Sequence, residues 1–388
     1  MKITCSKLYT ELLLIWWFLF LIAHQTTIGT SLGIPTGSIC SGGWLIIKIL
    51  LFFLIVIYGR RSPNAFIKSA VILLFGLITE RCSQNDMLEP FYWFMAAAQH
   101  VNVKDIIKKL YRVQIVVIAL VILLALTGII TNEVVKRTDG DLRYALGFDH
   151  PNTTGIMLLQ VTGLSFLLNY RKHDIKKYWI YIPTVALSYF GADSRTSSYL
   201  MVVLLIISII LDISKRGIFK KALVRVLRHA VLLTIVFVLV VFAAIFGYIR
   251  IGVSDYTFGT RLSLALNFYK YYGVKLFGQK IVLGIQDKRF INTMYTLDNA
   301  YMYLLLAFGL LAFITFLVLY IKTVRDNILE KRYGVVILLL IYLLVGFSET
   351  ALIRLIMNFT LIFMFESVWK KHKNQIESKK TMTGAVYG

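Results

Sequence analysis

Residues 191–200 read GADSRTSSYL, a short polar segment between two runs, 177–193 and 197–212, that are almost wholly apolar. An arginine such as Arg195 costs several kcal/mol when it is left in the hydrocarbon of a bilayer. The pattern therefore predicts a tight turn between two membrane-spanning helices, with Arg195 at the depth of the lipid headgroups. The small polar residues Ser194, Thr196 and Ser197 can hydrate or hydrogen-bond around it.

The rest of the chain repeats this alternation of apolar runs and polar connections. Its 388 residues are 58% hydrophobic, too apolar for a water-soluble core. Taking roughly 20 apolar residues for one span, with shorter runs where packing or tilt permits, we predict an all-α polytopic membrane protein, a single domain over residues 1–388. We expect about twelve transmembrane helices, near 8–24, 44–58, 66–80, 87–100, 113–131, 149–170, 177–193, 197–212, 229–249, 299–321, 334–349 and 351–369.

The formal charge of +22 would suit a nucleic-acid partner, but its distribution follows the membrane instead. If the N-terminus is cytoplasmic, most of the 42 lysines and arginines fall in the inner connections. The positive-inside rule then predicts that both termini, including the tail 370–388, are cytoplasmic. The anionic inner leaflet explains the basic clusters, and no nucleic-acid partner is expected.

The longest connection, residues 250–298, lies between the ninth and tenth expected spans and is placed outside the membrane by this topology. It is rich in Tyr, Phe, Leu and Ile, which is atypical of disorder. Thr260 can cap a helix from about Arg261 to Tyr272. Such a helix could lie flat on the outer surface and cover a cavity.

The topology also sorts the ionisable residues by side. Arginines gathered at one membrane level favour an anion, because each guanidinium keeps its charge and offers a planar fork of donors to phosphate oxygens. A lipid-linked diphosphate fits, since its phosphates lie at the headgroup level. Arginines could stabilise a diphosphate leaving group without a metal or a cofactor, and we expect neither. The residues near the outer ends of the spans are His150, Arg195, Arg250, Arg261, Asp298, Glu349 and Arg354.

Each of these residues also has a structural interpretation. Arg250 is better explained by snorkelling to headgroups, whereas Arg195, Arg261 and Arg354 are the candidates for binding a diphosphate. If the lipid-linked diphosphate is the donor of a glycosyl transfer, the reaction also needs a base near the hydroxyl of the acceptor. The candidates for this base are Asp298, His150 and Glu349. His150 could instead cap the span that follows, Asp298 could cap the helix starting at Asn299, and Glu349 could pair structurally with Arg354.

Four segments, in this order, resemble one family. They are GFDHPNTTG (147–155), SRTSS (194–198), FGTRLSLALNFYKYYGVKLFG (258–278) and DNAYMYLLLAFGLLAF (298–313). Together they resemble the polysaccharide polymerases of the O-antigen polymerase and ligase superfamily, particularly the capsule and exopolysaccharide polymerases. The resemblance covers residues 140–350. It implies an inverting, metal-independent glycosyltransferase that extends a glycan on undecaprenyl diphosphate at the outer face of a bacterial plasma membrane.

The resemblance also implies roles for individual residues. Arg195 and Arg261 match the diphosphate-contacting arginines of the family, and Asp298-Asn299 falls where ligases have His-Asn, the histidine being their proposed base. The base therefore stays open among Asp298, His150 and Glu349, or positioning and leaving-group stabilisation dominate the catalysis. The implied partners are an undecaprenyl-diphosphate-linked glycan donor and acceptor, the bilayer, a chain-length regulator and a flippase.

Two other functions compete with a polymerase. A ligase of the same superfamily would transfer finished glycan to a different acceptor, but Asp298 in place of histidine and the HPN motif at 150–152 lean against it. A flippase or transporter of lipid-linked oligosaccharides could also have a dozen or so spans. It should carry charges at several membrane depths, whereas these arginines lie mostly at the outer ends.

Overall fold

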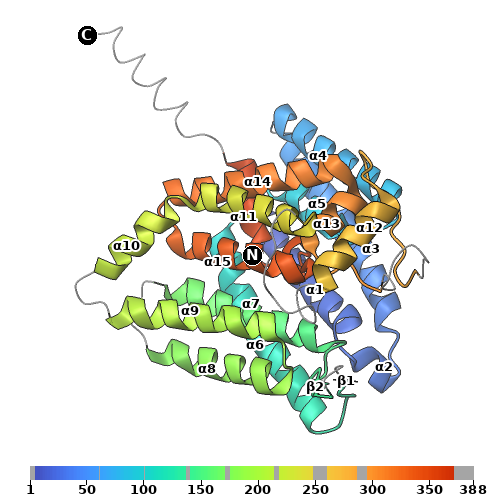
Figure 1. Cartoon of the computed structure of the whole chain (residues 1–388). Coiled ribbons are helices and arrows are strands. Elements are labelled where there is room, and N and C mark those ends of the chain that lie inside the picture. The colour runs from blue at the N-terminus through green and yellow to red at the C-terminus, as the bar shows by residue number, and fades with distance from the viewer. Residues whose placement is uncertain are drawn as a thin grey trace.

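The computed structural model describes residues 5–60, 62–99, 101–136, 140–170, 175–213, 218–247, 260–285 and 295–370 (Figure 1). The chain is mostly helical, as predicted. The helices are α1 (Cys5–His24), α2 (Ile28–Leu32), α3 (Thr36–Gly59), α4 (Pro63–Ser83), α5 (Glu89–Ala97), α6 (Val103–Leu126), α7 (Pro151–Asn169), α8 (Tyr178–Ala186), α9 (Arg195–Ile213), α10 (Ile218–Leu227), α11 (Ala230–Ile245), α12 (Thr260–Tyr272), α13 (Ala300–Tyr303), α14 (Gly309–Leu329), α15 (Tyr333–Ser348) and α16 (Leu361–Trp369).

Short turns of other geometry interrupt this helical pattern. They are the 3-10 turns η1 (Ile175–Lys177) and η5 (Thr350–Ile353) and the π-helical turns η2 (Leu187–Gly191) and η4 (Leu304–Phe308). The two strands in the described ranges, β1 (Val134–Lys136) and β2 (Leu142–Tyr144), pair antiparallel between α6 and α7. Side chains from α1 through α16 contribute to one hydrophobic core.

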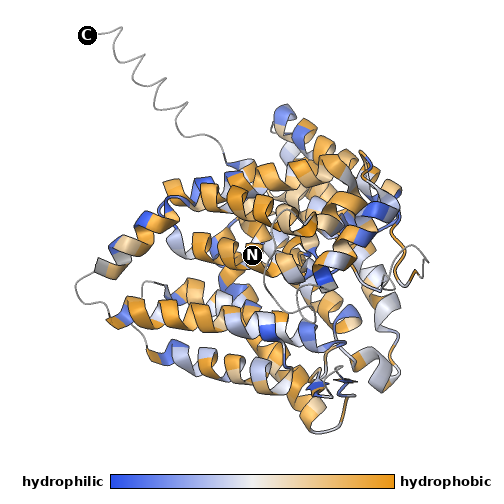
Figure 2. Cartoon of the chain, viewed as in Figure 1, coloured by the Kyte–Doolittle hydropathy of each residue, from blue (hydrophilic) through white to orange (hydrophobic). Residues whose placement is uncertain are grey.

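By length and hydropathy, five helical stretches within the described ranges could cross a membrane. They are α1, α3, α6, α9 and the stretch Ala300–Leu329, which comprises α13, η4 and α14. The bent pair Lys221–Leu227 and Ala230–Ile245, with a bend of 56°, makes a sixth if it counts as one span. Many large apolar side chains on these helices point outward, such as Ile46, Phe53 and Leu123. Figure 2 shows hydrophobic residues along the helices and hydrophilic ones mostly at their ends. The chain is thus a helical, membrane-embedded protein.

The expected count of about twelve spans exceeds these five or six. Every expected apolar run does contain helix, but several runs are short or broken. The run 87–100 corresponds to α5 and the run 351–369 to η5 and α16, and each of these two helices has only 9 residues. The run 177–193 divides between α8 and the π-helical η2. A hydropathy pattern counts apolar residues and cannot locate such breaks.

Two adjacent, largely buried helices, α7 and α15, run antiparallel through the protein. Asn152 at the start of α7 donates a hydrogen bond to Glu349, just beyond the end of α15. At the other end, Gly334 of α15 packs on the ring of Tyr170, which follows α7. The two helices therefore fix the positions of the residues at both of their ends.

The segment after α12 docks on the break between η4 and α14. The amide of Gln279 donates to the carbonyl of Ala307 (2.9 Å), and the amides of Leu310 and Leu311 donate to the carbonyls of Lys275 and Leu276 (3.0 and 3.1 Å). These bonds satisfy backbone groups that the break would otherwise leave unpaired. They anchor α12, whose Ala265 and Phe268 are fully buried. The helix predicted near Arg261 to Tyr272 is thus present.

We expect Gly278→Ala to destabilise this anchor. Gly278 has φ +91°, and an added Cβ would overlap the carbonyl oxygen of Ala307. Left-handed strain and backbone overlap together should lower the free energy of unfolding by about 3 kcal/mol. Gly273→Ala is the matched control, because Gly273 also has positive φ but open space around it. The measurement is Tm of the purified chain in detergent. Equal shifts for both variants would contradict the docking contact.

Candidate functional site

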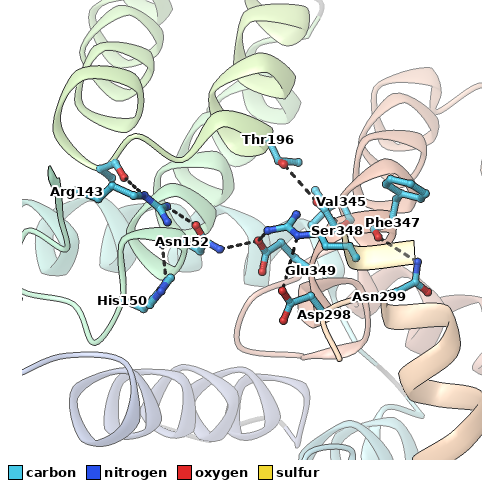
Figure 3. Close-up of polar contacts among 12 residues, drawn as sticks. Arg143, His150, Asn152, Thr196, Asp298, Asn299, Val345, Phe347, Ser348 and Glu349 are labelled. Atoms are coloured by element: carbon cyan, nitrogen blue, oxygen red, sulfur yellow. Dashed lines mark hydrogen bonds and ion pairs between the residues drawn. The ribbon is translucent and has the colours of Figure 1, made fainter. Parts of the chain in front are cut away.

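Polar residues from sequence-distant segments converge at β2, at the starts of α7, α12 and α13 and beyond the end of α15, with the start of α9 beside them (Figure 3). Helix ends favour such a cluster because their terminal backbone groups are free to bind polar partners. We call this group the Arg261 cluster. It comprises Arg143, His150, Asn152, Arg261, Asp298, Glu349 and Arg354.

Arg261 lies between two carboxylates. Its Nη2 is 3.5 Å from Oε1 of Glu349, and its Nε is 3.8 Å from Oδ2 of Asp298. Both distances are longer than a good charge-assisted hydrogen bond. The two carboxylates hold the guanidinium in place electrostatically. The Arg261 side chain is 26% exposed, so its guanidinium keeps donors for another anion. This ion pair brings together α12 and the α15 end, as the predicted site requires.

Asn152 connects Glu349 to a second arginine, which the sequence did not single out. Its Nδ2 donates to Oε1 of Glu349 (2.8 Å), and its Oδ1 accepts from Nη2 of Arg143 (2.5 Å). Arg143, on β2, is 92% buried and its Nε also donates to the carbonyl of Ala192 (3.3 Å). A buried guanidinium needs such partners. The one signal in the sequence is an arginine seven residues before the HPN motif.

Arg354 lies beyond η5 and is close enough to Glu349 to lower the pKa of that carboxyl. Its Nε is buried and forms no hydrogen bond within the described residues. A buried donor without an acceptor costs free energy, so an incoming anion would stabilise this position. Glu349 forms its ion pair with Arg261, and not with Arg354, the structural partner that the sequence also allows.

Arg195 begins α9 at the edge of the cluster. Its Nε is 3.4 Å from Oδ1 of Asp193, a residue in the left-handed region with φ 41°. The neighbouring Thr196 accepts a hydrogen bond from Ser348 (3.3 Å), which precedes Glu349. The tight turn predicted from GADSRTSS is therefore present, but its arginine contacts a local carboxylate.

His150 caps α7. Its Nδ1 accepts from the amide of Asn152 (3.1 Å), which leaves the ring proton of neutral His150 on Nε2. Burial lowers the pKa of His150, and the positive charge of Arg143 lowers it further, against the opposite effect of Asp298. The imidazole is thus neutral at pH 7, and in this arrangement it can donate but has no free lone pair to accept a proton.

Asp298 and Asn299 are adjacent but have different roles: Asn299 caps a helix, and Asp298 faces Arg261. The expected cap at Asp298 is wrong by one residue, because Oδ1 of Asn299 accepts from the amide of Met302 (2.9 Å) and caps α13. Asn299 also donates to the carbonyl of Phe347 (3.0 Å), which ties α13 to the end of α15. Asp298 therefore keeps its carboxylate free of the cap and facing Arg261.

Glu349 has the most perturbed carboxyl of the cluster. Burial raises the pKa of Glu349 from 4.5 to about 7, Arg261 acts in the opposite direction, and the nearby Asp298 raises it further. A carboxylate with this pKa is about half ionised at neutral pH and can accept a proton there. Desolvation of its charged form is the main cause, as for other functional carboxyls.

The structure thus brings Arg261, Asp298, Glu349, Arg354 and His150 together at one end of the helices, with Arg195 beside them. Arg250 lies outside the described residues. Among the described residues no three His, Cys, Asp or Glu side chains form a group suited to a metal ion.

Comparison of the chain with protein-family models, with curated proteins and with solved structures finds no match.

Asn152→Leu should raise the pKa of Glu349 above about 7. It removes a hydrogen bond that favours the charged carboxylate, and we expect a shift of about one unit. Infrared difference titration can follow the protonated carboxyl, with Glu349→Gln identifying the band. Asn169→Leu, at the other end of α7, is the control and should leave the titration unchanged. An unshifted titration in Asn152→Leu would contradict the contact.

Proposed function

We propose that this chain polymerises undecaprenyl-diphosphate-linked oligosaccharide repeat units into a surface polysaccharide at the outer face of a bacterial plasma membrane. The observation that carries the proposal is the convergence of three arginines from segments remote in sequence: Arg261 lies between Asp298 and Glu349, Arg143 reaches Glu349 through Asn152, and Arg354 is near enough to lower the pKa of Glu349. Such a cluster suits a bulky anion at a membrane surface. The family resemblance of residues 140–350 supplies the substrate class.

The proposed topology keeps the roughly twelve spans expected from the sequence. The short or broken elements α5, α8, α15 and α16 would cross together with the longer helices, covered by protein and therefore able to be short. The Arg261 cluster would face outward, the segment 250–298 would be extracytoplasmic, and both termini would lie in the cytoplasm. This arrangement places the diphosphate at headgroup depth, beside the arginines.

The chemistry we propose is an inverting displacement. A hydroxyl of the next lipid-linked unit attacks the anomeric carbon of the growing chain and forms the new glycosidic C–O bond. The bond from that carbon to the phosphate oxygen breaks, its electrons leave with the undecaprenyl diphosphate, and the hydroxyl proton passes to a base. Arg261 and Arg354 bind the departing diphosphate and stabilise its added charge, while Arg143 acts through Asn152 on the carboxylate.

Glu349 is the base that the geometry supports best. Its pKa of about 7 matches a proton acceptor at neutral pH. Asn152 and Arg261 hold its carboxylate in position. His150 uses Nδ1 to cap α7, and Asp298 contributes by orienting Arg261 and by raising the pKa of Glu349.

The test follows the substrate in cells that lack the chain and are supplied with Arg261→Ala or with the wild-type protein. Loss of a polymerase should leave single lipid-linked repeat units on the outer leaflet. Polymer that forms normally but stays on its lipid would indicate a ligase instead. Repeat units retained on the inner leaflet would indicate a flippase, and either of these outcomes would overturn the proposal.

A further inference from the structure

A second feature lies at the opposite ends of α7 and α15 from the Arg261 cluster. It is a cavity of about 730 Å³ beside Tyr170, Tyr333 and Gly334. With 19 residues in α7 and 16 in α15, these helices separate the cavity from the cluster by roughly 24–28 Å. That is close to the ~30 Å hydrocarbon thickness of a bilayer. The cavity and the cluster therefore lie about one bilayer thickness apart.

The inner wall of the cavity is apolar. Ile107 of α6, Val335 of α15 and Phe363 of α16 line it and are each at least 95% buried. Leu167 and Leu168 of α7 complete this wall. Such a surface favours hydrocarbon over water or an inorganic ion.

The mouth of the cavity carries an excess of positive charge. Arg332 pairs with Glu330 (2.9 Å) and with Glu366 (2.6 Å), and Lys370 also pairs with Glu330, so both lining glutamates already have cationic partners. Lys104 and Lys108 lie one turn apart on the same side of α6 and form no ion pair within the described residues. Their charge is available to a ligand.

Helix ends add to this positive field. The starts of α6 and α15 both line the cavity, through Asn102 to Lys104 and through Arg332 to Val335. A helix N-terminus carries a partial positive charge that attracts anions. Two long helices beginning at one cavity, beside two lysines without an ion pair in the described part of the chain, favour a phosphate at its mouth.

We propose that this cavity binds an anionic phospholipid, with the phosphate at Lys104 and Lys108 and the adjoining acyl segments on Ile107, Val335 and Phe363. The lysines match the charge of the phosphate, and the apolar wall matches the tail. A free phosphate would leave that wall uncovered. The lipid would fill the space between α6, α7, α15 and α16 at the surface opposite the Arg261 cluster, so this inference stands apart from the catalytic proposal.

Native mass spectrometry of the full purified chain tests the proposal, with phosphatidylglycerol, phosphatidylcholine and glycerol 3-phosphate as probes. We expect saturable retention of phosphatidylglycerol over phosphatidylcholine. The pair Lys104→Glu with Lys108→Glu should weaken it about tenfold, the loss of two charge-assisted contacts. Arg225→Glu with Arg228→Glu is the control, because these exposed arginines of α10 and its end carry the same charge but do not line the cavity. Leu167→Trp should fill the wall and weaken retention without a change of charge.

The outcomes distinguish a phospholipid from a soluble phosphate ester as the ligand. Equal losses in both double variants would mean attraction to charge in general and would overturn the proposal. Glycerol 3-phosphate binding as tightly as the phospholipid would overturn the role of the apolar wall. Lys104 and Lys108 are exposed, so their replacement leaves folding intact and keeps the test valid even if Leu167→Trp fails to fold.

Discussion

Arg261→Ala is expected to lower polymer formation by about 10³-fold when the purified chain acts on lipid-linked repeat units in liposomes, the loss typical of a removed donor to developing charge. Arg261 is the arginine placed between Asp298 and Glu349, so its guanidinium faces both the anion and the base. Arg261→Lys keeps the charge but loses the planar fork, and it should retain intermediate activity.

A neighbour on the same helix provides the control for this result. Lys270 is exposed near the end of α12, and Lys270→Ala removes one positive charge from the same segment without touching the cluster. We expect it to keep wild-type turnover. Similar losses in Arg261→Ala and Lys270→Ala would mean that the net charge of the segment matters and not a specific contact.

Glu349→Gln should remove the pH dependence of turnover together with most of its rate, about 10²- to 10⁴-fold for a lost general base. With a pKa of about 7, Glu349 is about one-tenth ionised at pH 6 and about nine-tenths at pH 8. Wild-type turnover should therefore rise about tenfold per unit below pH 7 and level off above pH 8. Asp298→Asn should lose less rate and shift the midpoint downward, because Asp298 raises the pKa of Glu349.

Stability gives an independent check on the same carboxyl. The folded pKa of Glu349 lies above its ordinary value of 4.5, so between these two pH values the folded chain binds more protons than the unfolded one. The free energy of unfolding should then fall as pH rises through this window, and Glu349→Gln should remove that fall. A pH profile of turnover identical in wild type and Glu349→Gln would contradict the role of this residue as base.

Local sequence predicted the helices well but not their continuity. Apolar runs specify helix in a membrane because no other open segment satisfies its own backbone. The interruption at Gly309 depends on carbonyls of Lys275 and Leu276, more than thirty residues earlier, which accept from Leu310 and Leu311. Contacts between such distant segments leave no trace in a hydropathy pattern.

The same limit applies to the site. Arg261, Asp298 and Glu349 could be gathered from the sequence because each lies near the end of an apolar run on one predicted side. Arg143 could not, because LRY reads as an ordinary polar connection and becomes buried only through Ala192 and Asn152. The role of Arg195 in binding the diphosphate stays a prediction, and the contact of its guanidinium with Asp193, two residues away, is one that the sequence pattern does not indicate. Side-chain direction at a turn decides such pairings.

Calorimetric titration of the purified full chain with a short-chain prenyl diphosphate tests most directly whether the guanidinium groups of the Arg261 cluster bind a diphosphate. We expect Arg261→Ala and Arg354→Ala each to weaken binding about tenfold or more, as for a lost hydrogen bond to a charged group, with Lys270→Ala unchanged. Equal affinity in wild type and all three variants would show that the cluster does not bind this anion.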